Sequence, residues 1–138
     1  MILRLATAAR NAALAGPGVA SLVDAGSGPG TIKIYGGSMP ANPATAPGSS
    51  PLATVVLGDP AFSAPSTGVS AGADPAAVNA TAGGAATWCR MADSDGNTVL
   101  DGDVTATGGG GFMQLSNTTL TSGAPVDVTS LQLTMPAS

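Results

Sequence analysis

The stretch WCRMADSDGNTVLDGDVTA, residues 88–106, decides the fold of this chain. An apolar run within Gly84–Met91 comes first, the polar segment DSDGN follows at residues 93–97, and an alternating pattern then covers Val99–Ala106. Two β-type runs joined by Asp, Gly and Asn are typical of a hairpin, because Gly and Asn tolerate the backbone angles of tight turns. The alternation predicts that one strand face carries Leu100, Val104 and Ala106 and the other carries Asp101, Asp103 and Thr105.

Shorter strand patterns lie on both sides of this hairpin. Thr31–Tyr35 alternates between apolar and polar residues, and Leu52–Leu57 is rich in Val and Leu. Phe112–Leu115 and the segment from Val126 onward predict two more strands, and weaker patterns cover residues 62–64, 69–71 and 78–82. Many short strands separated by Gly, Pro, Asn and Asp predict a mainly β fold, a single β-sandwich of jelly-roll character over residues 27–138.

The last strand changes the parity of its apolar positions near Thr129-Ser130. The apolar residues that are expected to face inward are Val126, Val128, Leu131, Leu133 and Met135. Side chains alternate strictly along a regular strand, so one extra residue is needed for the even and odd positions to share a face. The sequence therefore predicts a β-bulge at this point.

Residues 1–26 are predicted to form a short helical arm ahead of the β domain. Apolar positions from Ile2 to Leu14 follow helical spacing, Gly16-Pro17-Gly18 interrupts them, and a second helical set runs from Val19 to Val23. Two interpretations stay open. The arm closes one end of the core, or it docks on a neighbouring subunit.

The segment Ser38–Pro51 is predicted to be a loop. It contains four prolines among many Ala, Ser and Gly residues, a composition that cannot bury enough apolar surface to fold alone. Its length exceeds that of most connections between strands. We expect either a mobile flap or an extension that binds a partner.

The composition argues against catalysis. The chain has no histidine, its eight acidic residues are all aspartate, and one lysine is found among its four basic residues. General acid-base catalysis usually relies on a group that titrates near neutral pH, and a nucleophile needs a base beside it. We therefore expect a non-enzymatic protein that needs no cofactor.

Charge narrows the range of partners. With a net charge of −4 and 3% aromatic residues, the chain lacks the clustered cations and stacking rings of nucleic-acid binding. No apolar run approaches the roughly 18 residues of a membrane span. Charged residues make up only 9% of the chain, which suits a protein that packs among neighbouring subunits.

Three groups of residues could carry chemistry, and each has a plainer interpretation. The segment Asp93–Asn97, with Asp101 and Asp103, offers oxygen ligands for calcium, but Gly96 falls at the fourth position of the loop and not at the sixth, so an ordinary turn is favoured. Cys89 has no histidine to activate it and is expected to be a buried structural thiol. The aromatic residues could form a sugar-binding platform, although core positions are commoner for them: Tyr35, Trp88 and Phe112.

Several segments carry a resemblance to known proteins. They are GTIKIYGG at 30–37, LATVVL at 52–57, DPAF at 59–62, TWCRMADSDG at 87–96 and VDVTSLQLTMP at 126–136, after an N-terminal Ala/Leu helix with Arg10-Asn11. In this order they resemble small proteins encoded among the structural genes of tailed bacteriophages, over nearly the whole chain. Gly16-Pro17-Gly18 departs from that family, in which the helix is continuous. The resemblance implies a virion component, such as a head decoration or cement protein on the outside of a capsid shell.

The leading expectation is a capsid decoration protein, assembled in the bacterial host cytoplasm and located on the capsid exterior. Its expected partners are the major capsid protein and copies of itself, with trimers suited to local three-fold positions. The residues expected at the interface lie in the N-terminal segment and in the Pro-rich loop: Ile2, Leu3, Arg4, Leu5, Arg10, Met39, Pro40, Pro43 and Pro47. The alternative is a tail or collar component that binds host-surface glycans through Trp88, Tyr35 and nearby Asp residues.

Overall fold

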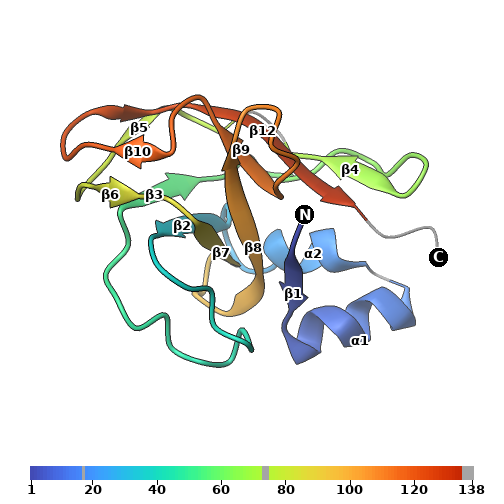
Figure 1. Cartoon of the computed structure of the whole chain (residues 1–138). Coiled ribbons are helices and arrows are strands. Elements are labelled where there is room, and N and C mark those ends of the chain that lie inside the picture. The colour runs from blue at the N-terminus through green and yellow to red at the C-terminus, as the bar shows by residue number, and fades with distance from the viewer. Residues whose placement is uncertain (17, 73–74, 135–138) are drawn as a thin grey trace.

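The computed structural model describes residues 1–16, 18–72 and 75–134, and its fold is mainly β with two short helices (Figure 1). The helices are α1 (Thr7–Ala15) and α2 (Val19–Val23). The strands of the first half are β1 (Leu3–Leu5), β2 (Thr31–Tyr35), β3 (Ala53–Val56), β4 (Val69–Ala71) and β5 (Val78–Asn79). The remaining strands are β6 (Gly84–Ala85), β7 (Trp88–Ala92), β8 (Thr98–Ala106), β9 (Met113–Leu115), β10 (Thr119–Leu120), β11 (Pro125–Val126) and β12 (Val128–Thr134).

The predicted hairpin is confirmed, and it forms the middle of the main sheet. Strands β7 and β8 pair antiparallel, with Arg90 opposite Asp101 and Met91 opposite Leu100. The strand order is β3-β2-β7-β8-β9-β12-β4, and β1 also pairs with β8. Strand β8 is long enough for one of its edges to pair with β1 over residues 100–102 and, in parallel, with β9 over residues 104–106. The sheet that results is curled, as Figure 1 shows.

One face of the hairpin builds the core. Cys89, Met91 and Leu100 are fully buried, together with Ile32 and Ile34 of β2. The same cluster contains apolar residues from the opposite side of the curled sheet and from the arm: Ala9, Val19, Val23, Phe112, Met113, Leu115, Leu131 and Leu133. The helical arm and the β-strands therefore share a single core, and α1 and α2 both contact β8.

Gly102 lies in the middle of β8, where glycine is otherwise unfavourable. The Phe112 ring packs directly against it, and a Cβ at this position would overlap the ring. Phe112 is itself fully buried. The glycine is thus required by the close approach of an aromatic side chain to the strand backbone.

The β-bulge predicted near Thr129-Ser130 is confirmed. The pairing of β12 with β9 shifts register between Val128 and Ser130. On the two sides of this shift, Val128 packs against the core and Leu131 is buried, although their positions differ in parity. Met135, which belongs to the predicted pattern, lies outside the described residues.

The prediction of one helix from Ile2 to Leu14 is wrong at its start. Residues Leu3–Leu5 form β1, which pairs with Leu100–Gly102, and the helix begins only at Thr7. A segment of three residues fits the helical and the strand period equally well. The edge of β8 offers hydrogen-bonding partners, so these three residues adopt the strand conformation. Helix α1 ends at Gly16, which adopts a left-handed conformation with φ of 111°. The second helical segment is confirmed as α2, and Pro17 lies outside the described residues.

The predictions for the intervening segments hold in outline. Ser38–Pro51 contains neither helix nor strand. The weak pattern at residues 62–64 gives only an isolated bridge between Phe62 and Gly72. Neither helix in the described part of the chain, of nine and five residues, has the length of a bilayer span.

Candidate functional site

The face of the hairpin that points away from the core carries three of the four basic residues of the chain. Lys33 on β2 is opposite Arg90 on β7, Arg90 is opposite Asp101 on β8, and Asp101 is opposite Arg4 on β1. The four side chains therefore form one row across four neighbouring strands, because directly paired residues lie on the same face. We call these residues the charged row.

Arg90 and Asp101 form an ion pair in the middle of the charged row. Arg90 Nε donates to Asp101 Oδ1 at 2.7 Å, and Arg90 Nη2 donates to Oδ2 at 2.8 Å. The Asp101 side chain is fully buried and the Arg90 side chain is 11% exposed. The hydrogen bonds to Asp101 raise the pKa of Arg90 although burial opposes this change. The Arg90 guanidinium therefore keeps its positive charge.

Asp101 is buried, although it lies on the polar face of its strand. The residue does lie on the face opposite to Leu100, as the alternation indicates, but that face is covered. The alternation of a strand identifies its two faces and does not show what packs on each of them. Here the covering group includes the Arg90 guanidinium itself.

The aromatic residues Tyr35 and Trp88 lie beside the charged row and stack on each other. Their ring centroids are 4.5 Å apart with an interplanar angle of 15°, and the Arg90 guanidinium lies 5.6 Å from the Trp88 ring. Trp88 Nε1 donates to the Gly36 carbonyl at 3.2 Å. Since Trp88 is 1% exposed and Tyr35 is 3% exposed, the expectation that these rings belong to the interior is confirmed. The sugar-binding platform does not form from these residues.

The Pro-rich loop Ser38–Pro51 is tied to the N-terminal segment. Arg4 Nη1 donates to the Met39 carbonyl at 3.0 Å and also to the Pro40 carbonyl. Thr87 Oγ1 donates to the Gly37 carbonyl at 2.6 Å. Three residues of the predicted interface, from two segments some 35 positions apart in the sequence, are thereby brought together.

The other residues of the predicted interface differ in how exposed they are to solvent. Ile2 and Arg10 are exposed, whereas Pro43 is buried. Leu3 and Leu5 are half-buried and pack against the core, and Pro47 is half-buried. Three large apolar side chains outside the predicted interface are exposed as well: Met1, Leu14 and Val56. The helical spacing could have identified Leu14, because it lies opposite the buried Ala9 and Ala12 of α1.

The turn at residues 93–97 uses the carboxylate of Asp93 for its own hydrogen bonds. The backbone N–H groups of Asp95 and Asn97 donate to Oδ1 at 3.0 and 2.9 Å, and Asn97 Nδ2 donates to Oδ2 at 2.9 Å. Burial by itself would raise the pKa of Asp93, but these hydrogen bonds outweigh it and lower the pKa. The ordinary turn is confirmed. Within the described ranges, no three His, Cys, Asp or Glu residues come together as metal ligands.

Cys89 is a packed thiol. It is fully buried on β7 between Ile34 of β2 and Gly102 of β8, its neighbours in the sheet. Burial raises its pKa, and the nearby Asp101 and Asp103 raise it further. The expectation of a structural thiol is confirmed, because a thiolate is needed for reactivity.

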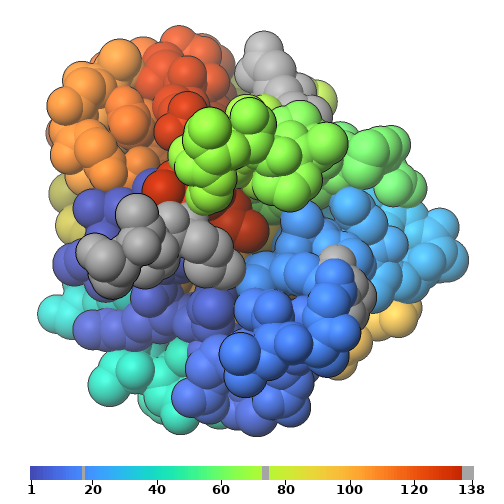
Figure 2. Space-filling model, turned by 90° about the vertical axis from the view of Figure 1, so that its right-hand side faces the viewer, coloured from blue at the N-terminus to red at the C-terminus, as the bar shows by residue number. Residues whose placement is uncertain are grey.

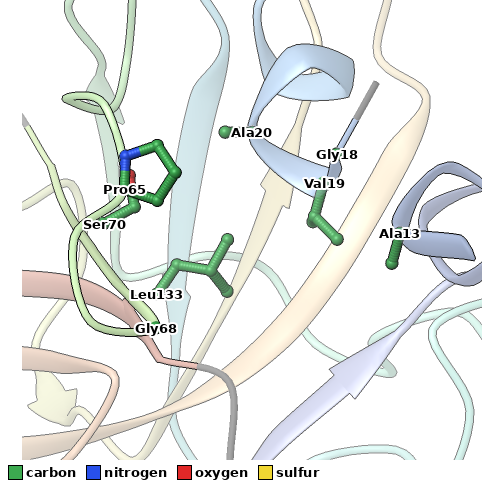
Figure 3. A pocket seen from close by; sticks show the side chains of 8 residues that line it. All are labelled: Ala13, Gly18, Val19, Ala20, Pro65, Gly68, Ser70 and Leu133. Carbon is green, nitrogen blue, oxygen red and sulfur yellow. The ribbon is translucent and has the colours of Figure 1, made fainter. Parts of the chain in front are cut away.

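An apolar hollow of about 400 Å³ lies between the helices and the segment around β4. Figure 2 shows the helices in blue and this segment in green on one face of the molecule, and Figure 3 shows Leu133 of β12 between them. The lining residues include Ala13, Val19, Ala20, Pro65, Ser70 and Leu133. Sequence reasoning missed this hollow, because its residues come from four separate segments.

Comparisons with known proteins identified no relative of this chain. No family model matches the chain, and neither the curated proteins nor the solved structures contain a significant match.

Proposed function

We propose that the protein is a non-enzymatic virion structural protein of a tailed bacteriophage, a decoration protein that binds the outside of the capsid shell. Its partners in this proposal are the major capsid protein and neighbouring copies of itself. The proposal includes the finer fold class, a β-sandwich of jelly-roll character, with which the curled sheet is compatible.

The observation that carries the proposal is the exposure of apolar side chains on the N-terminal arm. Leu14 is 89% exposed, Ile2 is 54% exposed and Met1 is 49% exposed. These are three of the four large apolar side chains found exposed in the described ranges, and all lie within the first 14 residues. An apolar group of this kind gains free energy when a partner covers it.

Three of the ionisable groups considered for chemistry are already engaged within the fold, which supports a structural role. Asp101 is engaged by Arg90, Asp93 is engaged by its own turn, and Cys89 is enclosed in the core. A capsid partner that binds only the folded, assembled shell stabilises that shell by mass action. Such a mechanism needs shape and exposed apolar groups, and it needs no reactive side chain.

Binding to purified capsid shells tests the proposal. We expect the wild-type protein to saturate shells of its phage and to raise their resistance to heat. Changing both Ile2→Ser and Leu14→Ser is expected to weaken binding at least about tenfold, because covering one such side chain contributes roughly 1.5–3 kcal/mol.

The matched control is Val56→Ser. Val56 is 45% exposed on β3, which Figure 1 places far from α1, so this variant is expected to bind shells as the wild type does. A wild-type protein that does not bind shells at all would contradict the proposal. Equal binding by the double variant and the wild type would show that the N-terminal arm is not part of the binding surface.

A further inference from the structure

A recess of about 240 Å³ lies on the outer face of the sheet, between Pro47 of the Pro-rich loop and Gly96 of the hairpin turn. Its polar lining comes from β2, β7 and β8: Thr31, Lys33, Tyr35, Arg90 and Thr98. None of the lining residues in the described part of the chain is an aspartate. In a chain with a net charge of −4, two of the four basic side chains meet here.

Lys33 and Arg90 are directly opposite each other on neighbouring strands. Like charges in this arrangement are destabilising unless a negative group lies between or beside them. Asp101 neutralises Arg90 from one side only, through Nε and Nη2. Lys33 is exposed, and Arg90–Asp101 is the one ion pair within the described ranges. The recess therefore keeps one uncompensated positive charge.

The Arg90 guanidinium is already fixed in place. It is held by the two hydrogen bonds to the buried Asp101, and it lies over the Trp88 ring. Its Nη1 has no hydrogen-bond partner among the described residues. A donor that is fixed before binding loses little conformational entropy when an anion arrives. Charge-assisted bonds from guanidinium and ammonium groups suit a carboxylate, and the hydroxyl groups of the lining residues can add further donors.

We propose that this recess binds the side-chain carboxylate of an aspartate from a second copy of the chain. The inference rests on the proposed function in so far as that function places copies side by side. Asp59, between β3 and β4, and Asp127, between β11 and β12, are both exposed, and neither is in an ion pair with a described residue. Neither belongs to the recess of its own chain. The contact joins two different parts of the surface, so it gives a closed two-fold dimer where it is reciprocal and rings or open chains of subunits where it is not.

Sedimentation velocity of the isolated protein, at low ionic strength and over increasing concentration, tests this inference. The sedimentation coefficient of the wild type is expected to rise with concentration. Lys33→Gln should weaken the association at least about tenfold, which corresponds to about 1.4 kcal/mol. Arg10→Gln is the matched control, because Arg10 is exposed and donates only to Thr7 of its own helix. Its association should equal that of the wild type.

Two further comparisons identify the ligand group and its source. Sodium acetate should dissociate the assembly more strongly than sodium chloride at the same ionic strength, because acetate competes for the recess whereas chloride mainly screens. Either Asp59→Asn or Asp127→Asn should weaken association as Lys33→Gln does.

Three results would overturn the inference. The first is a sedimentation coefficient that stays constant up to millimolar concentration. The second is an association of the Lys33→Gln variant that equals that of the wild type. The third is a protein that stays monomeric but binds glucuronate, a sugar carboxylate, at the recess. None of these measurements uses capsid shells. A failure of the inference is thus distinguishable from a failure of the proposed function, which shell binding tests separately.

Discussion

Arg90 holds the fully buried carboxylate of Asp101 through two hydrogen bonds of 2.7 and 2.8 Å, across the centre of the β7-β8 hairpin. The same guanidinium lies over Trp88, which stacks on Tyr35. One cross-strand ion pair therefore holds the side chains of the outer face of the sheet in place, whereas apolar packing holds those of the inner face. The pair also fixes Arg90 where the recess beside Lys33 needs it.

Removing one partner of this pair is expected to be costly. Asp101→Ala should lower the free energy of unfolding by about 3–5 kcal/mol, because Arg90 would keep its charge in a largely buried place without a partner. Urea denaturation followed by the fluorescence of Trp88, the only tryptophan, measures the change. The exposed Asp127→Ala is the control and should stay within about 0.5 kcal/mol of the wild type. A similarly small effect of Asp101→Ala would contradict this account of the pair.

A methyl group at position 102 is expected to disturb the core. Gly102→Ala should destabilise the protein by about 1–3 kcal/mol, because the new Cβ would overlap the Phe112 ring and force it to move. Gly28→Ala provides the comparison, since a Cβ there meets no atom within 4 Å. Thermal unfolding of both variants checks the prediction. Equal melting temperatures for the two would show that Phe112 does not pack against the strand as described.

The turn at Asp93 predicts a dependence of stability on pH. The pKa of Asp93 is lowered in the folded protein, so its carboxylate stabilises the fold fully above the unfolded pKa of about 3.9. This contribution is lost as the pH falls through the lower, folded value. Asp93→Asn should therefore be less stable than the wild type at pH 7, by about 1–2 kcal/mol, and the difference should shrink below about pH 4.

Urea midpoints of the two proteins, measured from pH 7 down to pH 2.5, give this difference directly. The exposed Asp59→Asn serves as the control, and its difference from the wild type should stay small throughout the range. A difference for Asp93→Asn that is the same at pH 7 and pH 2.5 would rule out the carboxylate as its source.

The contact between Arg4 and the Pro-rich loop predicts how strongly the backbone amides of the loop are protected from hydrogen exchange. Arg4→Gln removes the donor to the Met39 and Pro40 carbonyls, so hydrogen exchange within residues 38–51 should become faster. Exchange within β7 should stay the same, because its hydrogen bonds to β2 and β8 do not involve Arg4. Unchanged exchange in the loop, measured by mass spectrometry on peptides, would show that this contact does not hold it.

Local patterns predicted much of this fold, because the alternation along a strand is a property of neighbouring residues. The strand at Thr31–Tyr35 and the bulge near Thr129-Ser130 were recognisable from apolar spacing, and the hairpin from apolar spacing together with its turn residues. The strand at Leu3–Leu5 was not, because its conformation depends on an edge of β8 that lies about 100 positions further along the chain.

The candidate sites were harder to predict for the same reason. The burial of Asp101 depends on the side chain that covers it, and no pattern around Asp101 shows this. The link from Arg4 to Met39 and the apolar hollow lined by Leu133 join segments far apart in the sequence. The composition indicated that few groups are available for chemistry, but only the structure shows which of them are already engaged.

The central claim is that this chain decorates a phage capsid, and its copy number in purified particles tests that claim most directly. Quantitative mass spectrometry of virions from the phage that encodes it, relative to the major capsid protein, gives this number. The account predicts a number of copies comparable with that of the major capsid protein. Absence from the virion, or a handful of copies confined to the tail, would contradict it.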